Sequence, residues 1–572
     1  MASRVGLPYR IRAPLQWVGR NNKPSSATKA LAADSIGEET WSPLQAPNYL
    51  RLVLTSKVYE AVSVTPLQHA PTLSASFGNN VYLKREDMTP GFSFKLRGVF
   101  NRMSQLSPEE KENGVVTYST GNHGFATARA ASQLGVNATI VMPTALPPDR
   151  YRRVSTLGAK VHQVASSSGT ITSTDAMKEA QLIAQATGAA FIHPFDDPLV
   201  IAGNGTVGME IVNQFRGQSP IDAVFVCCGG GGLLAGVAAY IKAVTPWVKV
   251  IGVEGWRNDA MTQSLNAGRR ISIDEGDSNM SLFAEGASCP KVGEETFRVC
   301  NELVDDMVVV TNDEICAAIE NGFEETRAML EPAGALALAG MKKYIAEHSL
   351  EGHSFVAVTS GANMKFDRLR FVAERSLIGE GREALLSVVI PERPGAFKQL
   401  YGHIYPRNVT EFSYRAKTNG VGGGDTDGAT IFISVATEPE RPDEVAKLVT
   451  ELVAAGFDAV DLSSNEMAKS HTRYLVGGRP SACIEGERLY RFEFPERPGA
   501  LKHFLDCLHQ DWAVTLFHYR NHGTDVGKVL AGITLPTTLS AADQERAWTD
   551  FLSKVGFVHT DETNNAAALF VQ

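Results

Sequence analysis

The sequence predicts an α/β protein in which two parallel-sheet subdomains are followed by two smaller α+β modules. Three observations lead to this prediction. Short apolar runs alternate with helix-length segments between residues 81 and 358. The motif PERPGA occurs at 391–396 and again at 495–500. At 572 residues the chain is also too long for one ordinary domain.

The strand-like runs of the first region are short and almost wholly apolar, which is typical of sheets covered on both faces. They lie at residues 81–84, 114–118, 138–142, 160–164, 223–226, 248–253, 307–310 and 355–358. Helices are predicted between them at 124–134, 173–186, 207–215, 234–244 and 313–328. The last helix follows a good N-cap candidate, Thr311. This alternation predicts parallel sheets in two subdomains with a cleft between them.

The C-terminal third contains an internal repeat. Each PERPGA copy follows a strand-like run and precedes a helix-like run, which lie at 385–390, 397–404, 489–494 and 501–508. Further on, FSYR at 412–415 is matched by FHYR at 517–520. Two copies with matching motifs predict two similar α+β modules, reached through a polar, glycine-containing linker near 379–382.

Composition excludes several classes of protein. The net charge of −9 argues against nucleic acid as a partner. No apolar run reaches the roughly 18 residues that a membrane span needs, so no membrane partner is expected. The seven cysteines are scattered and contain no C-x-x-C motif. They predict a reducing compartment and no metal site.

The first acidic residue of the chain is Asp34, and the segment before it is rich in arginine, lysine, serine and proline. This composition partly fits an organelle transit peptide, and the alternative is a disordered basic tail. We therefore expect residues 1–46 to be a targeting or disordered segment. The mitochondrial matrix is favoured over the cytoplasm as the location.

A run of four glycines, 229–232, follows the apolar run 223–226 and opens a helix-like stretch. Glycine lets the backbone approach a ligand and turn its N–H groups inward, and the following helix adds partial positive charge. A phosphate is the natural occupant of such a turn. The alternative is a tight strand-to-helix turn without a ligand.

Three further segments carry candidate reactive groups. Lys95 lies between Phe94 and Leu96, an apolar setting that can lower an amine pKa, as an imine-forming lysine requires; the alternative is an ordinary solvated lysine. The loop YSTGNHG at 118–124 offers hydroxyls, an amide and backbone N–H groups that suit a carboxylate and a phenolic oxygen. The segment TSGAN at 359–363 could place a serine hydroxyl at a ring nitrogen.

In their order along the chain, these segments resemble the pyridoxal-phosphate enzymes of fold type II, and among them the threonine deaminase (threonine ammonia-lyase) family. Further stretches that agree lie at 55–60, 81–87, 293–297 and 474–480. The repeated modules look like the paired ACT-like regulatory domains of that family. The resemblance covers roughly residues 47–572. It implies a catalytic domain at 47–375 and regulatory modules at 383–460 and 487–570.

The resemblance implies a role for each matching residue. Lys95 is expected to be the Schiff-base lysine that also moves the α-proton, and Ser360 is expected to face the pyridine nitrogen of pyridoxal 5′-phosphate. Asn122 is expected to bind the phenolic oxygen. The phosphate is expected at Gly229, Gly230, Gly231, Gly232 and Leu233. The substrate carboxylate is expected at Ser119, Thr120, Gly121 and His123, although His123 could instead shape the loop.

The activity that the resemblance implies is the α,β-elimination of L-threonine, and of L-serine by the same route. The products from threonine are 2-oxobutanoate and ammonia, in the first committed step of isoleucine biosynthesis. Isoleucine is the expected inhibitor and valine the opposing activator, both bound by the C-terminal modules. The expected assembly is a homotetramer.

Other readings remain open at this point. Serine/threonine racemase, cystathionine β-synthase and threonine synthase share the fold, but the tandem modules argue against them. A related enzyme of a specialised pathway, such as a serine/threonine dehydratase or racemase, is a further alternative. A catalytically silent amino-acid sensor is the alternative from a different class, and the intact Lys95, Asn122, glycine run and Ser360 argue against it. The segment 287–291, expected near the cofactor ring, departs from the family pattern. The choice between threonine and another β-substituted amino acid therefore stays open.

Overall fold

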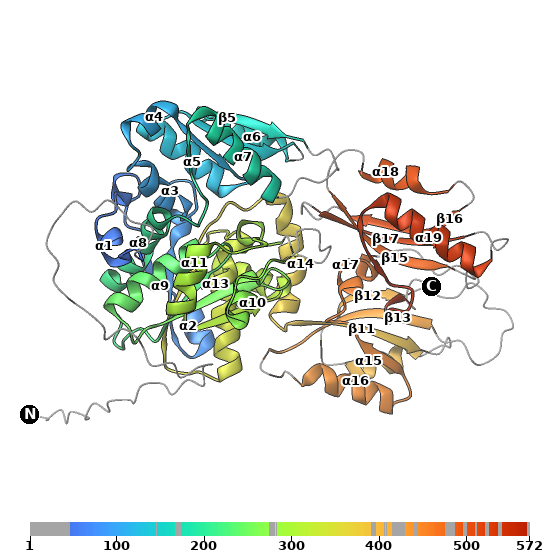
Figure 1. Cartoon of the computed structure of the whole chain (residues 1–572). Coiled ribbons are helices and arrows are strands. Elements are labelled where there is room, and N and C mark those ends of the chain that lie inside the picture. Colours follow the sequence, from blue (N-terminus) through green and yellow to red (C-terminus); the bar gives the residue numbers. More distant parts are fainter. Residues whose placement is uncertain are drawn as a thin grey trace, which may run out of the picture.

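The computed structural model describes residues 46–568, except 145, 166–172, 274–280, 282, 391–395, 405–406, 408, 415–428, 440, 442, 475–486, 496–499, 510–511, 521–525 and 536–539. Two α/β subdomains form one part of the molecule, and two smaller α+β modules lie beside them (Figure 1). The predicted fold class is confirmed.

The large subdomain is built on a six-stranded sheet in the order β1-β2-β10-β7-β8-β9. Its strands are β1 (Leu67–His69), β2 (Asn80–Arg85), β7 (Ala223–Cys227), β8 (Lys249–Gly255), β9 (Asp306–Val310) and β10 (Ser354–Thr359). All neighbours pair in parallel except β1, which runs antiparallel to β2 at the edge. The expectation of purely parallel pairing is therefore wrong at this one edge.

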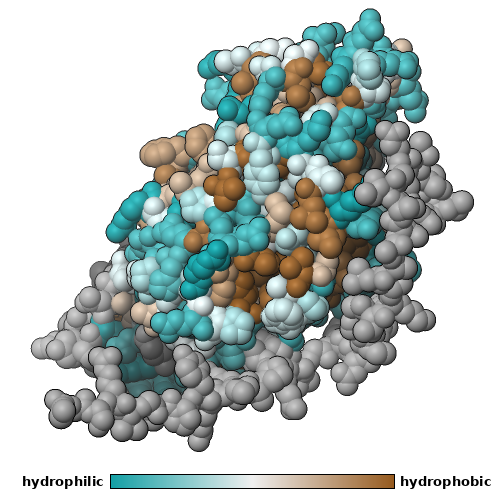
Figure 2. All heavy atoms as spheres, turned by 90° about the vertical axis from the view of Figure 1, so that its left-hand side faces the viewer, coloured by the Kyte–Doolittle hydropathy of each residue, from teal (hydrophilic) through white to brown (hydrophobic). Residues whose placement is uncertain are grey.

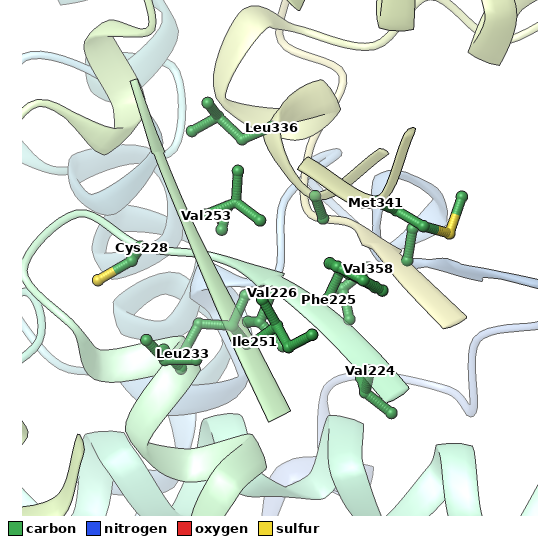
Figure 3. Close-up of a cluster of buried hydrophobic side chains, with 14 of the residues drawn as sticks. Val224, Phe225, Val226, Cys228, Leu233, Ile251, Val253, Leu336, Met341 and Val358 are labelled. Atoms are coloured by element: carbon green, nitrogen blue, oxygen red, sulfur yellow. The ribbon is translucent and has the colours of Figure 1, made fainter. Parts of the chain in front are cut away.

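Helices cover both faces of this sheet, as the apolar strands predict. On β8, Val253 contacts Gly340 of α13 (Pro332–His348), while the adjacent Gly252 faces Leu234 of α9 (Gly232–Val244). Successive strand residues point to opposite faces, so α13 and α9 lie on opposite sides. Figure 3 shows the resulting core, in which Phe225 lies among side chains of neighbouring strands and of α13.

The small subdomain has a parallel four-stranded sheet in the order β5-β4-β3-β6. Its strands are β3 (Val115–Tyr118), β4 (Ala138–Pro143), β5 (Lys160–Val164) and β6 (Ala190–Phe191). Helices α5 (Asn122–Leu134) and α7 (Ser173–Thr187) pack on this sheet, and α3 (Lys95–Met103) packs against both α5 and α8 (Pro198–Gln214). Helix α3 therefore joins the two subdomains.

The predicted strands are all present, whereas β1 and β6 were missed because three and two residues are too few to show a pattern. Helix α8 begins at Pro198, well before the predicted start at residue 207. Asp197 caps it by accepting from the N–H groups of Leu199 and Val200. The glycines of its first half read as a loop in the sequence. One of them, Gly203, lets α3 approach closely, since a Cβ there would lie 2.6 Å from the Arg97 carbonyl oxygen.

The two C-terminal modules repeat one architecture, as the sequence predicts. Their antiparallel sheets have the orders β12-β13-β11-β14 and β16-β17-β15-β18. The first contains β11 (Glu383–Ile390), β12 (Val409–Tyr414), β13 (Ala429–Ala436), β14 (Asp458–Asp461), α15 (Ala396–Ile404) and α16 (Glu444–Ala454). The second contains β15 (Arg488–Pro495), β16 (Ala513–Arg520), β17 (Val526–Thr534), β18 (Val558–Asp561), α18 (Ala500–Cys507) and α19 (Ala541–Val555). Most of both PERPGA motifs lies outside the described residues.

The two module sheets share a buried cluster that includes Leu385, Phe432, Leu489 and Leu530, so the modules pack as a pair. The other helices are α1 (Tyr49–Leu54), α2 (Pro71–Phe77), α4 (Pro108–Asn113), α6 (Pro148–Ser155), α10 (Ala260–Ala267), α11 (Glu294–Leu303), α12 (Asn312–Thr326), α14 (Leu369–Gly379) and α17 (Glu466–Ser470). Short 3₁₀ turns include η4 (Glu285–Ala287) and η5 (Phe366–Arg368).

The N-cap predicted at Thr311 is present as a capping box with Glu314, at the start of α12. The face on the left of Figure 1 is mainly hydrophilic, with hydrophobic residues in small groups between (Figure 2). In the part of the chain that the structure describes, no helix combines the length and apolarity needed to cross a bilayer.

Candidate active site

A pocket lies between the two α/β subdomains. It is formed where strands β7 and β10 of the large sheet end and where helices α3, α5, α9 and α13 begin. Carboxyl ends of parallel strands are the usual position for a ligand site in α/β folds. Its wall consists of Ser93, Phe94, Lys95, Asn122, Phe195, Cys227, Gly229, Gly230, Gly231, Gly232, Leu233, Gly286, Ala287, Glu331, Ala333 and Ser360.

The glycine turn forms one side of this pocket. Gly231 has φ of 93° and caps α9, a backbone conformation that side chains other than glycine rarely adopt. A Cβ on Gly230 would lie 2.4 Å from the Phe195 ring, and one on Gly229 would lie 2.7 Å from the Ala287 carbonyl oxygen. The turn therefore presents backbone alone, at the N-terminus of a helix, which fits a phosphate.

Lys95 is the first residue of α3, and its side chain enters the pocket. Nζ donates a hydrogen bond to the carbonyl oxygen of Pro194 at 3.0 Å. Loss of solvation lowers the pKa of the amine to about 8. A substantial fraction of the amine is therefore neutral near physiological pH, as a nucleophile or base requires.

Two polar side chains from other elements line the same pocket as Lys95. Asn122 begins α5, and its Nδ2 donates to Oε1 of Glu331 at 2.6 Å. Ser360 follows β10, and its hydroxyl donates to the Ala333 carbonyl oxygen and accepts from the Cys227 thiol, both at 3.2 Å. Burial raises the pKa of Cys227 to about 11, so this thiol stays neutral. The hydroxyl of Ser360 thus has no charged sulfur beside it.

The residues expected to hold the substrate carboxylate, at positions 119–121 and 123, are not in the pocket wall. Ser119 Oγ accepts from the N–H of Gly121 at 3.0 Å, and the Thr120 carbonyl accepts from Arg150. His123 is buried beneath the loop, where Nε2 lies 2.9 Å from Thr117 Oγ1. Burial, with the nearby charge of Lys95, lowers its pKa to about 3, so the imidazole is neutral. These contacts fit a loop-shaping role for His123.

Sequence reasoning missed several residues of the pocket wall. Phe195 belongs to a loop after β6, a strand too short to be predicted, so no pattern marked it. Glu331 stands directly before Pro332, which is a helix-start signal, but nothing in the sequence shows that its carboxylate is buried. Gly286 and Ala287 lie in or beside the segment expected near the cofactor ring, and the structure places both in the pocket wall.

The pocket therefore combines a buried amine of lowered pKa, a backbone anion cradle, an amide and a neutral hydroxyl. These are the groups needed to hold a phosphorylated pyridine aldehyde, and the crowded glycine turn is the observation that fits its phosphate most specifically. Among the residues that the structure describes, no group of three or more His, Cys, Asp or Glu is arranged to hold a metal ion.

Two protein families match the chain. The family described as "Pyridoxal-phosphate dependent enzyme" matches residues 58–361. The family described as "C-terminal regulatory domain of Threonine dehydratase" matches residues 374–472 and 478–571. The first match contains both α/β subdomains, and the second contains both modules.

Relatives and solved structures agree with these matches. The chain is 46% identical over 524 residues to "Threonine dehydratase, mitochondrial" of Saccharomyces cerevisiae, covering 91% of this chain and 88% of the relative. It is 44% identical over 528 residues to "L-threonine dehydratase biosynthetic IlvA" of Escherichia coli, covering 92% and 97%. The structure of processed threonine deaminase isoform 2 from Solanum lycopersicum aligns with a TM-score of 0.54 at 43% identity, over 57% of this chain and 92% of that one.

A serine racemase also resembles the first part of the chain. The structure of the maize enzyme aligns with a TM-score of 0.51 at 29% identity, over 56% of this chain and 96% of that one. Its likeness therefore stops short of the C-terminal modules, which match the threonine dehydratase regulatory region. The modules therefore favour a threonine dehydratase over a serine racemase, two activities that the shared catalytic fold leaves open.

Proposed function

The chain belongs to the pyridoxal-phosphate-dependent threonine dehydratases that carry a C-terminal regulatory region, and we propose that the pocket around Lys95 is where its reaction takes place. The enzyme is a threonine ammonia-lyase of isoleucine biosynthesis. It converts L-threonine to 2-oxobutanoate and ammonia. The observation that carries the proposal is that Lys95, Asn122, the glycine turn and Ser360, from four distant segments, line one pocket.

Pyridoxal 5′-phosphate would be held by the backbone of residues 229–233, by the Asn122 amide, by the Ser360 hydroxyl and covalently by Lys95. When bound, the cofactor supplies an electron sink that stabilises negative charge at the substrate Cα. The protein contributes orientation and the placement of charge. Because Ser360 is neutral and lies beside a neutral thiol, it does not force a positive charge on the ring nitrogen, which favours elimination over transamination.

Lys95 is the base of the reaction in this proposal. Its amine would take the proton from the substrate Cα, where the bound cofactor would stabilise the negative charge that this leaves. The lowered pKa keeps the amine ready to accept that proton near neutral pH. The loop at 119–123 is assigned to the substrate carboxylate, with His123 as a neutral support of the loop.

We assign residues 47–375 to catalysis, 383–460 and 487–570 to regulation, and 1–46 to targeting. The regulatory family match supports small-molecule control. Isoleucine is proposed as the inhibitor, valine as the opposing effector and a homotetramer as the assembly. The relatives of Saccharomyces cerevisiae and Schizosaccharomyces pombe are named mitochondrial, which supports the matrix as the location, whereas plant relatives are named chloroplastic.

The experiment is 2-oxo-acid formation from L-threonine by the purified, cofactor-loaded protein, with and without isoleucine. Turnover that isoleucine suppresses supports the reaction, the substrate and the role of the modules together. A panel with L-serine and other β-substituted amino acids runs in parallel. Use of any of them at least about 100-fold better than threonine would overturn the threonine assignment and point to the segment 287–291.

A further inference from the structure

The side-chain amide of Asn122 is held at both ends by groups outside its own helix. Asn363 directs Nδ2 at the carbonyl oxygen of Gly91 (2.9 Å), which can only accept, while its Oδ1 accepts from Arg153 at 2.6 Å. The Asn122 atom that lies 2.8 Å from this Nδ2 must then be Oδ1. The other end of the Asn122 amide is therefore Nδ2, which donates to Glu331 at 2.6 Å.

Backbone contacts hold Glu331 at the start of α13. It precedes Pro332 at the start of α13, and its N–H donates to the carbonyl oxygen of Gly361 at 3.1 Å. A Cβ on Gly361 would lie 2.3 Å from Glu331 Oε1, so only glycine leaves space for this carboxylate. The side chain also lines the pocket beside Lys95. The carboxylate is therefore fixed between two subdomains, at the group expected to bind the cofactor.

The carboxyl group of Glu331 is poised to change its charge near neutral pH. Burial raises its pKa to about 7, against the hydrogen bond from Asn122. Charged and titratable groups face it from α6, β7, η4 and η5. They are Arg150, Arg153, Cys227, Glu285 and Arg368, and the amine of Lys95 on α3 lines the same pocket. Glu285 raises the pKa further, whereas Arg150 and Arg368 lower it.

We propose that Glu331 is a positioning residue of the reaction, whose carboxylate orients the Asn122 amide toward the phenolic oxygen of the cofactor. This inference rests on the proposed function of the pocket. The amide nitrogen carries two hydrogens, and Glu331 takes one, which leaves the second for the cofactor. An ionised carboxylate is the stronger acceptor, so the amide is held most firmly above the pH at which Glu331 gains its proton.

The test compares Glu331→Gln with the wild-type enzyme and with Glu347→Gln, a matched change at an exposed position of the same helix. Glutamine keeps a neutral acceptor of the same shape and removes the charge. The apoproteins are titrated with pyridoxal 5′-phosphate between pH 6 and pH 9, with protein fluorescence as the signal. We expect Glu331→Gln to weaken cofactor binding about tenfold at pH 8 and by a smaller factor at pH 6, so that the ratio of the two affinities depends on pH around pH 7, while the titration of Lys95 affects both proteins alike and Glu347→Gln matches the wild type.

A second arm asks whether Glu331 acts through Asn122. In an Asn122→Ala background, adding Glu331→Gln should change cofactor affinity less than twofold, because the amide that Glu331 orients is gone. Steady-state turnover should show a lower kcat for Glu331→Gln with a smaller change in KM for threonine. Far-UV circular dichroism of each apoprotein shows whether the variant is folded.

Two results would overturn the proposal while the proposed function stands. One is wild-type affinity and pH dependence in Glu331→Gln. The other is a full effect of Glu331→Gln in the Asn122→Ala background, which would give Glu331 a role independent of the amide. If the wild-type protein itself neither binds the cofactor nor turns over threonine, the proposed function fails, and this inference fails with it.

Discussion

At the scale of single residues, Lys95 is a buried amine of lowered pKa that lines the pocket. In the proposed function, its replacement by alanine removes both the covalent anchor of the cofactor and the base. We expect Lys95→Ala to lose the visible absorption of the bound cofactor and to lower turnover by at least about 10³-fold. Lys111→Ala, a change at an exposed position of α4, is the control. Turnover retained by Lys95→Ala would contradict the central assignment.

The lowered pKa of Lys95 makes a separate prediction about pH. Only the neutral amine attacks an aldehyde, so the rate of cofactor attachment to the apoprotein should rise with pH and level off above about pH 8. Below that value the rate should fall about tenfold per pH unit. Stopped-flow absorbance measures it directly. A rate that keeps rising to about pH 10 would show an ordinary solvated lysine.

The residues that the sequence indicated are those with a local pattern around them. Lys95, Asn122 and Ser360 each follow a strand or turn and sit in short motifs, and all three line the pocket. Glu331 and Phe195 have no such pattern. Their importance comes from contacts between segments far apart in the chain, such as the pairing of Glu331 with Asn122, which a single sequence does not show.

At the scale of elements, the turn between β7 and α9 has no space for side chains. A Cβ on Gly230 would lie 2.4 Å from the Phe195 ring. We expect Gly230→Ala to push this ring or the turn aside, lowering cofactor affinity at least tenfold and stability by about 1–3 kcal/mol. Gly402→Ala in α15, where a Cβ would meet nothing within 4 Å, is the matched control. Cofactor titration and thermal unfolding of both variants decide the prediction, and unchanged affinity in Gly230→Ala would contradict it.

Helix α3, which carries Lys95, is anchored by a buried group of charges. Arg97 pairs with Glu86 and with Glu210 at 2.7 Å each, and Lys84 pairs with Glu210 at 2.5 Å. Burial acts to raise the pKa of Glu210, but Arg97 and Lys84 outweigh it and lower the value. Glu210 therefore stays ionised at neutral pH, and its contribution to stability is lost only as the pH falls into the acid range.

Removing Arg97 leaves two carboxylates buried with too little positive charge. We expect Arg97→Met to destabilise the catalytic region by about 3–5 kcal/mol, because an uncompensated buried charge costs far more than an exposed one. Arg152→Met, which breaks an exposed pair with Asp149, should change stability by less than about 1 kcal/mol. The first unfolding transition in urea measures both. Equal effects of the two changes would show that the buried group does not anchor α3.

The strands and the repeated modules were predictable because each has a period or a repeated motif. The start of α8 was not, because its glycines serve close packing against α3 and read as a loop in the sequence. The antiparallel edge strand β1 was missed for a related reason, since its three residues, two half-buried and one exposed, gain their strand geometry from β2. In both cases contacts between distant segments decide the local structure.

At the scale of the whole molecule, a junction of charges joins the catalytic region to α17, which follows the first module, and through α17 to the second module. Arg375 of α14, which lies between the two parts in Figure 1, pairs with Asp313 of α12 at 2.9 Å and with Glu466 of α17 at 2.7 Å. Lys528 of β17, in the second module, reaches the same Glu466 at 2.6 Å. Helix α12 packs on α13, whose first turn adjoins the pocket at Glu331. A movement of the modules can therefore alter the position of α12.

An effector controls activity only if it binds one arrangement of the molecule better than another. Removing the modules would expose the buried face of this junction, so a point change is the cleaner test. We expect Lys528→Gln to leave turnover without effector within about twofold and to weaken the inhibition proposed for isoleucine at least about fivefold. The physical reason is that Glu466 then loses its ion pair with Lys528 of the second module. Lys554→Gln, an exposed change in the same module, should leave inhibition as it is. An unchanged inhibition constant in Lys528→Gln would show that effector binding does not depend on the ion pair with Glu466. The coupling between the modules and the pocket would then run through other contacts.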